Sequence, residues 1–319
     1  MKEIQRRKRK MKNKVYGIIG IKAIMSNWNA DFSGYPKTTP TGEIFASDKA
    51  LKFTMRKFWE EQGEMVLYTR SHTLVSDSKG RMVLVPRSLS ERYTQFFKSE
   101  VTEKTNSVEV LGNLFKVLDV RTFGATFAET KNNYSITGAV QIGQGMNVFE
   151  NTQTFDQQIL SPFRDKTSDE LAQNTTIGSM ILSDEAHYYY PFSINPNAYR
   201  NYIELSITEG YKDQDYQAFK KAALSSVSAF SSNSKAGCDN EFALFIETDE
   251  KTYLPNLTNF ISFKKGGDKD TLHLDLGKLI EAHKDQIKSV EIYFDSLHLD
   301  IESDISNAQY FDIYTKVAL

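Results

Sequence analysis

Two long polar stretches, residues 72–115 and 148–180, interrupt a chain whose other segments are patterned with apolar residues. Structureless loops longer than about 15 residues are uncommon inside compact domains. The first stretch is therefore interpreted as an inserted subdomain with a helix near 89–99, and the second as a functional or mobile segment. A length of 319 residues allows two domains, or one domain that carries large insertions.

Hydrophobic periodicity predicts the regular elements between these stretches. Strands are expected at 15–25, 64–69, 118–127, 135–142, 241–248 and 290–294, with an ordered aromatic segment at 188–194. Helices are expected from Ser47 to Gly63, from about 213 to 228, and over 276–286. Without the insertions the order is strand, helix, strand, strand, helix, strand. This order predicts an α+β, ferredoxin-like fold, which RNA-recognition domains share.

Charge is distributed unevenly along the chain, although the net charge is only −2. Residues 1–14 contain eight basic residues and one acidic residue, whereas residues 268–312 contain eleven acidic and four basic residues. A basic face suits phosphate groups, and an acidic face suits solvent or a basic neighbour. Two interpretations of the first ten residues stay open: a basic arm that touches nucleic acid, or a leader preceding a true start at Met11.

The single cysteine, Cys238, excludes an internal disulfide and a cysteine zinc site. It is typical of a reducing interior. No apolar run reaches the roughly 18 residues that a membrane-spanning helix needs. We therefore expect a soluble, cytoplasmic protein with no membrane partner.

The loop over 27–41 and the helix that follows form the strongest candidate for a binding site. Lys49, Lys52 and Arg56 share one helix face at i, i+3 and i+7, opposite the apolar stripe. The helix start at Ser47 offers backbone N–H groups to a phosphate, and Lys37 adds a charge from the loop. Together they could hold a sugar-phosphate backbone without reading its sequence. By spacing alone, a merely solvated charged face is the favoured interpretation.

A second candidate consists of the glycine-containing segments RTFGATF (121–127) and GAVQIGQGMN (138–147). Glycine lets another backbone or a ligand come close. The spacing matches neither a dinucleotide fingerprint nor a phosphate-binding P-loop. Bulges and turns explain these glycines equally well.

Signals for catalysis are weak. The five histidines are scattered, and His273 and Asp275 alternate on an expected strand without a third metal ligand. No GxSxG nucleophile elbow is present. Asp31, in the first loop, is the one carboxylate that stays a catalytic candidate.

Five segments occur in a fixed order across about residues 15–240: VYGIIGIKAIMSNWNAD, TGEIFASDKALKFTMRKF, VRTFGATF with GAVQIGQGMN, TIGSMILSDEAHYYYPFSINP, and SSNSKAGC. In them the sequence resembles the CRISPR type I-B Cascade backbone-subunit family (the Cas-seven family), within the repeat-associated mysterious protein superfamily. The first loop departs from the family's Pro-rich NPNGD-like pattern. The helix also loses one basic position and gains another.

The resemblance implies a right-hand architecture, with fingers and a thumb attached to a ferredoxin-like palm. The implied parts are a basic N-terminal arm (1–14), palm segments (15–71, 116–147 and 186–250), a fingers insertion (72–115), a thumb β-hairpin or loop (148–185), and an acidic C-terminal part packed on the palm (251–319). It further implies a thumb that orders on assembly, reaches across the RNA to the next copy, and displaces a base at regular intervals.

The implied function is to bind the guide crRNA along its backbone and present its bases to a target DNA strand. Its partners are other copies of itself head to tail and other Cascade subunits. No catalytic residue, cofactor or metal is implied. The candidate RNA-binding set is Asn27, Asn29, Lys37, Ser47, Lys49, Lys52, Arg56, Arg70, Arg121, Gln141, Gln144, Met146, Asn147 and Lys235. The alternatives are a type III-like subunit that cleaves bound RNA through Asp31, and a general RNA-binding protein.

Overall fold

The computed structural model describes residues 10–130, 132–160 and 176–319. Most of the predicted basic arm and the middle of the predicted thumb lie outside these residues. Within the described part of the chain, no helix is long and apolar enough to cross a membrane.

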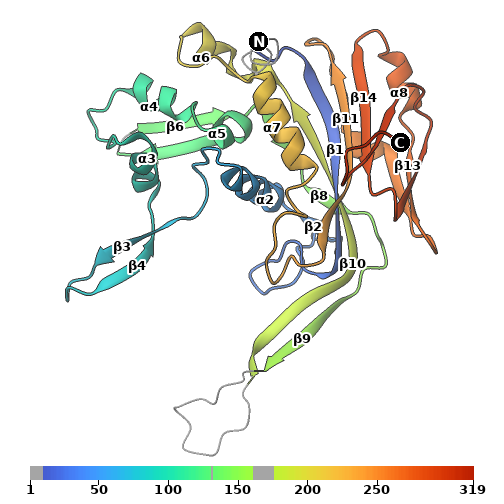
Figure 1. Ribbon diagram of the computed structural model, residues 1–319, viewed down its shortest axis with the longest axis horizontal. Helices are drawn as coiled ribbons and strands as arrows, with labels where there is room; N and C mark the ends of the chain where they lie inside the picture. The colour runs from blue at the N-terminus through green and yellow to red at the C-terminus, as the bar shows by residue number, and fades with distance from the viewer. Residues whose placement is uncertain (1–9, 131, 161–175) are drawn as a thin grey trace, which may run out of the picture.

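A nine-stranded sheet forms the centre of the molecule (Figure 1). Its main path runs in the order β16-β14-β11-β1-β10-β8-β2, and β7 and β9 pair with β10 outside this path. Every pairing is antiparallel except the one between β14 and β16. The strands are β1 (Lys14–Ser26), β2 (Phe45–Ala46), β7 (Val140–Ile142), β8 (Gly145–Asn147), β9 (Thr154–Leu160), β10 (Thr176–Ile194), β11 (Cys238–Thr248), β14 (Ile287–Phe294) and β16 (Gln309–Asp312).

Strand β1 lies between β10 and β11 and is hydrogen-bonded to both. Gly17 fits here because a Cβ at this position would lie 2.0 Å from the Leu244 carbonyl oxygen and 2.4 Å from the Phe192 ring. Successive side chains of a strand point to opposite faces. Residues of β1 therefore contribute to two separate hydrophobic cores, with Ile19 in one and Ile18 in the other.

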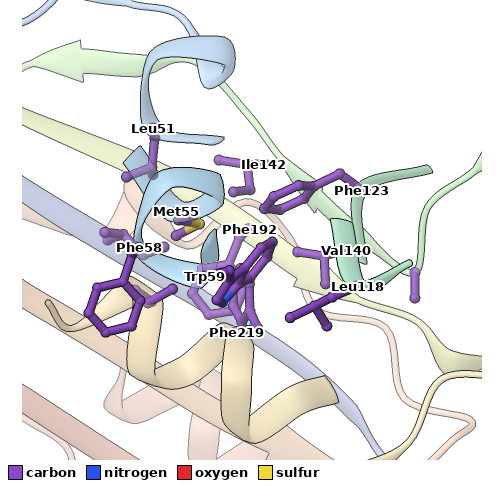
Figure 2. Close-up of a cluster of buried hydrophobic side chains, with 14 of the residues drawn as sticks. Leu51, Met55, Phe58, Trp59, Leu118, Phe123, Val140, Ile142, Phe192 and Phe219 are labelled. Carbon is purple, nitrogen blue, oxygen red and sulfur yellow. The ribbon is translucent and has the colours of Figure 1, made fainter. Parts of the chain in front are cut away.

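The first core lies between the sheet and the helices α2 (Asp48–Glu61), α5 (Leu118–Phe123) and α7 (Asp213–Ala223). Figure 2 shows Leu51, Met55 and Trp59 of α2 among side chains from the sheet and from α7. The Trp59 indole Nε1 donates to the Ala218 carbonyl oxygen at 3.1 Å, which joins α2 to α7. The apolar stripe predicted for α2 is thus buried as expected.

The second core lies on the opposite face, under a three-stranded sheet in the order β12-β13-β15 (Figure 1). Leu272 and Leu274 of this sheet pack with Leu244 and Ile292 of the central sheet. The short elements of this region are β12 (Ile261–Lys264), β13 (Asp270–Leu274), β15 (Leu299–Ser303), α8 (Gly277–Ala282) and the 3₁₀ helix η2 (Leu257–Phe260). The protein therefore has three layers: helices, central sheet, and small sheet.

The remaining elements lie beside the helical layer or extend from the body. The hairpins β3–β4 and β9–β10 both project away from the central sheet (Figure 1). These remaining elements are β3 (His72–Ser76), β4 (Met82–Pro86), α3 (Leu89–Phe97), α4 (Ser107–Leu114), β5 (Gly124–Glu129), β6 (Asn132–Thr137), the 3₁₀ helix η1 (Pro196–Tyr199) and α6 (Arg200–Glu204). The helix predicted near 89–99 is confirmed as α3.

The strand predicted over 64–69 is wrong, because this segment has no regular structure. Its backbone N–H groups bond to a side chain instead of a neighbouring strand. Leu67 and Tyr68 donate to the two carboxylate oxygens of Asp119, at 2.9 and 3.0 Å. Asp119 is fully buried and also accepts from Arg56 Nε at 3.0 Å.

Four further predicted elements differ in their boundaries. Residues 118–127 begin as the helix α5 and become strand only at Gly124, whose φ of +79° favours glycine. The expected strand over 135–142 is divided into β6 and β7. The helices predicted over 213–228 and 276–286 are shorter, ending at Ala223 and Ala282.

We expect Asp119→Ala to lower the free energy of unfolding by about 3 kcal/mol, because it leaves Arg56 and two buried N–H groups without their acceptor. Urea unfolding followed by circular dichroism measures this. Glu281→Ala removes an exposed carboxylate that pairs with Lys284, and its effect is expected to stay within about 0.5 kcal/mol. Equal effects of the two substitutions would contradict the anchoring role of Asp119.

Candidate nucleic-acid interface

The first loop is joined to the start of α2 by one side chain. Asn29 Oδ1 accepts from both the backbone N–H and the hydroxyl of Ser47, at 2.8 and 2.9 Å. Ser47 is the N-cap residue as predicted, but its hydroxyl makes no capping bond within the helix. Asn29 and Ser47, which both belong to the candidate set, therefore hold the loop against the helix.

The three basic residues predicted to share a face of α2 do not form a free basic surface. Lys49 is exposed. Lys52 Nζ lies 2.8 Å from Asp48, and its side chain is 13% exposed. Arg56 pairs with the buried Asp119 and lies 5.3 Å from the Phe123 ring centre. Of the three, Lys49 extends into solvent, whereas Arg56 belongs to the packing between α2 and α5.

Arg121 and Asn147 are also engaged inside the protein. The Arg121 guanidinium donates to Asp215 Oδ1 from Nε and Nη2, at 3.1 and 2.8 Å, and to the Phe115 carbonyl oxygen at 3.0 Å. Asn147 Nδ2 donates to the Phe149 carbonyl oxygen, and its Oδ1 accepts from the His187 backbone N–H. These side chains position the elements around them.

Two further candidates, Asn27 and Lys235, hold the first loop in place through hydrogen bonds to backbone carbonyl oxygens. Asn27 Nδ2 donates to the carbonyl oxygens of Gly34 and Ile181, at 2.8 and 3.1 Å. Lys235 Nζ donates to the Trp28 carbonyl oxygen and lies 4.8 Å from the centre of the Trp28 ring. Burial lowers the pKa of Lys235 below its usual range.

The remaining candidates are distributed over the first loop, the region of β7 and β8, and the segment before β3. Gln144 Nε2 reaches Asp48 at 3.4 Å, which places it beside the helix start. Met146 is 37% exposed on β8, between β2 and β10. Arg70 and Gln141 are exposed, and Lys37 is half-buried. The exposed members of the candidate set are Lys49, Arg70, Gln141, Gln144 and Met146.

An ionic network around the buried His187, which the sequence did not indicate, lies on the face of the central sheet that the small sheet covers. His187 is fully buried, and its Nδ1 and Nε2 lie 2.9 Å from Glu241 and 3.0 Å from Glu185. Lys265 Nζ joins Glu185 to Asp270, at 2.6 and 3.2 Å. The network connects β10 with β11 and with the small sheet. The spacing of these residues along the chain gave no signal of it.

Glu185, His187 and Asp270 place their ligand atoms within 4.8 Å of one another, a grouping that could hold a metal ion. The spacing of these three residues in the sequence does not indicate such a group. The Lys265 ammonium already contacts both carboxylates. The charges of the two carboxylates are therefore balanced by ion pairs, without a metal ion.

We expect the histidine of this network to make stability depend on pH. Burial opposes the charged imidazolium, but Glu241 and Glu185 outweigh it, so the pKa of His187 is raised above 6.5. A raised pKa contributes stability that is fully present below pH 6.5 and is lost as pH rises through the folded-state value. Burial likewise opposes ionisation of Glu185, but Lys265 and His187 lower its pKa below 4.5, so its contribution is lost only in acid.

Urea midpoints measured from pH 6.5 upward should therefore fall for the natural protein and stay flatter for His187→Gln. His72→Gln, at an exposed position on β3, is the matched control and should keep the natural pH profile. An unchanged profile in His187→Gln would show that this imidazole is not charged in the folded protein.

Comparison with known proteins shows to which family the chain belongs. A family model described as CRISPR-associated protein Cas7 matches residues 13–285. The chain belongs to this family. A search of curated proteins found no match.

Two solved structures illustrate the likeness in fold. One is a chain described as "CRISPR RNA-guided surveillance complex, pre-nicking", 14% identical, with a TM-score of 0.51 over 92% of this chain and 96% of that one. Another, described as "CRISPR RNA-guided surveillance complex", is 15% identical, with a TM-score of 0.45 over 91% and 95%. The first likeness shows that this mixed α/β arrangement of several sheets is shared with a chain of such a complex.

Proposed function

We propose that this protein is a repeated backbone subunit of a CRISPR Cascade surveillance complex and binds the guide crRNA along its sugar-phosphate backbone. The observation that carries the proposal is the Cas7 family match over residues 13–285. The type I-B assignment rests on the ordered sequence segments. Copies stack head to tail in the cytoplasm with other Cascade subunits, and the guide bases pair with target DNA.

The division into palm, fingers and thumb is part of the same proposal. The central order β11-β1-β10, continued by β7 and β8, supports a ferredoxin-like palm, because that fold places its fourth, first, third and second strands in this sequence. The projecting hairpin β3–β4 belongs to the proposed fingers and β9–β10 to the proposed thumb (Figure 1). In this arrangement the first loop lies at the base of the thumb, since Asn27 and Tyr35 bond to the hairpin.

The surface of the candidate set suits backbone binding more than base reading. Lys37, Lys49 and Arg70 carry the charge that phosphates require. Gln144 and Met146 lie beside the start of α2, where they can contact sugars and bases. The engaged side chains of Arg56, Arg121 and Lys235 hold these elements in place.

We also propose that the subunit is not an enzyme. Asp31 Oδ1 accepts from the Ser33 N–H and hydroxyl, both at 2.8 Å, and from the Tyr35 N–H at 3.1 Å. The hydrogen bond from Ser33 is the main cause that lowers the pKa of Asp31. This carboxylate is thus committed to shaping the turn, which supports a structural role over the type III-like alternative.

The assembled complex should leave a complementary RNA intact in the presence of Mg²⁺, as gel electrophoresis of labelled RNA would reveal. Cutting that disappears in Asp31→Asn, a variant that keeps an acceptor oxygen for the turn, would establish the type III-like alternative.

The proposal predicts that the protein, expressed with a CRISPR array and its partner genes, co-purifies with short RNA of repeat-spacer origin. Sequencing of the bound RNA measures this. The same preparation from cells without the array serves as the control. Recovery of heterogeneous cellular RNA in both preparations would instead favour a general RNA-binding protein.

We expect Lys49→Ala to weaken RNA binding without lowering stability, because the side chain extends into solvent. Losing one phosphate contact on a single strand should flatten the slope of log affinity against log salt by about 0.7. Lys52→Ala should change the slope less, since its ammonium pairs with Asp48. Lys278→Ala, an exposed lysine on α8, is the control. If Lys49→Ala had the same slope of log affinity against log salt as the natural protein, Lys49 would be only a solvated charge and not a phosphate contact.

A further inference from the structure

Two arginines at the base of the β3–β4 hairpin have no ion-pair partner in the part of the chain that the structure describes. Five of the seven arginines in this part form salt bridges with carboxylates: Arg56, Arg81, Arg92, Arg121 and Arg200. The two that do not, Arg70 and Arg87, flank the same hairpin. Arg70 lies two residues before β3, and Arg87 directly follows β4. The uncompensated guanidinium charges of the described chain are therefore gathered at one place.

Arg87 is half-buried, and its Nε is enclosed by the protein without a hydrogen-bond partner. Its backbone N–H donates to the Ser71 carbonyl oxygen at 2.9 Å, which continues the register of the hairpin beyond the pair of His72 and Pro86. Residues opposite each other in an antiparallel ladder place their side chains on the same face. Ser71 Oγ is likewise enclosed without a partner. Two unsatisfied polar groups thus lie side by side at the base of the hairpin.

Carboxylates of the neighbouring elements are engaged with other groups. Glu91 Oε2 accepts from the Ser88 N–H in the capping box of α3. Glu60 pairs with Arg92. An enclosed donor without an acceptor costs free energy, and natural proteins keep few of them. The base of the hairpin therefore has room for an anion that the described chain does not itself supply.

The chemistry of this segment favours a nucleic-acid phosphate as that anion. Residues 70–87 contain four basic residues and one acidic residue, Asp77, which pairs with Arg81. An arginine guanidinium fits the oxygens of a phosphate in bidentate geometry. Figure 1 shows α2, which carries the proposed phosphate contact Lys49, between the hairpin β3–β4 and the hairpin β9–β10. The base of the β3–β4 hairpin thus borders the proposed interface.

We propose that Arg87, together with Arg70, binds a backbone phosphate of the nucleic acid that the subunit holds, at a second position separate from Lys49. This assignment rests on the proposed function. The phosphate belongs either to the guide RNA or to the target DNA strand paired with it, because both backbones carry the same group. In either case the contact is independent of base sequence, and it fixes how the nucleic acid lies against the β3–β4 hairpin.

The test measures affinity against salt concentration for the natural protein, Arg87→Met and Arg87→Lys in two arms. The first arm binds single-stranded repeat-spacer RNA to the protein, and the second binds a complementary DNA strand to the guide-loaded complex. In one arm, Arg87→Met should weaken binding about 10-fold or more, the loss expected for a charge-assisted hydrogen bond. The slope of log affinity against log salt should flatten by about 0.7 to 0.9 in that arm, which identifies the strand. Arg87→Lys keeps the charge and should keep the slope.

Arg81→Met is the matched control, because it removes an arginine of the same hairpin whose charge Asp77 already balances. It should bind normally in both arms. The urea midpoint of Arg87→Met should equal or exceed that of the natural protein, since this substitution removes no internal partner. A lower midpoint would assign Arg87 to the stability of the fold and overturn the proposal.

Natural affinity and slope of Arg87→Met in both arms would overturn the phosphate position while leaving the proposed function intact. An equal loss in Arg81→Met would also overturn it, because the effect would then belong to the general charge of the hairpin. Loss of an acidic protein subunit from the Arg87→Met complex, with natural nucleic-acid binding, would assign the arginine to a protein contact instead. Absence of guide binding by the natural protein would refute the proposed function itself.

Discussion

The antiparallel pairing of β1 with both β10 and β11 is the interaction on which the rest of the structure depends. It makes β1 a central strand whose two faces belong to two different cores. The helices that present the first loop pack on one face, and the small sheet packs on the other. At Gly17 a Cβ would meet the Leu244 carbonyl oxygen and the Phe192 ring, so any larger residue there would force β1 away from its neighbours.

Some basic residues of this protein pair with buried carboxylates and others are exposed, and the sequence alone does not distinguish the two kinds. Arg56 and Arg121 look like surface charges in the sequence, but their partners Asp119 and Asp215 are buried. Those partners lie 63 and 94 residues further along the chain, so no local pattern connects them. Burying a charge is costly without such a partner, which explains why each guanidinium is paired. Lys49, by contrast, is exposed and has no ion-pair partner among the described residues.

Sequence patterns predicted the elements whose own side chains decide their structure. The run at 15–25, the stripe of α2 and the strand β11 follow from local periodicity. The segment 64–69 has the composition of a strand, yet the carboxylate of Asp119 takes the N–H groups that a strand would use. For the candidate site, too, local sequence patterns predicted only part of what the structure shows. Helical spacing predicted the exposed position of Lys49, whereas the exposure of Phe32 and the pairing of His187 depend on the folded chain.

Strand β10 runs without interruption from Thr176 to Ile194, from the projecting hairpin into the middle of the central sheet. Nineteen residues of strand extend over about 60 Å. At the root of this arm, the ion pairs of Glu185 and His187 join β10 to β11 of the same sheet and, through Lys265, to the small sheet. Because β10 is paired with β9 in the arm and with β1 in the body, one strand connects the described end of the arm to the centre of the protein.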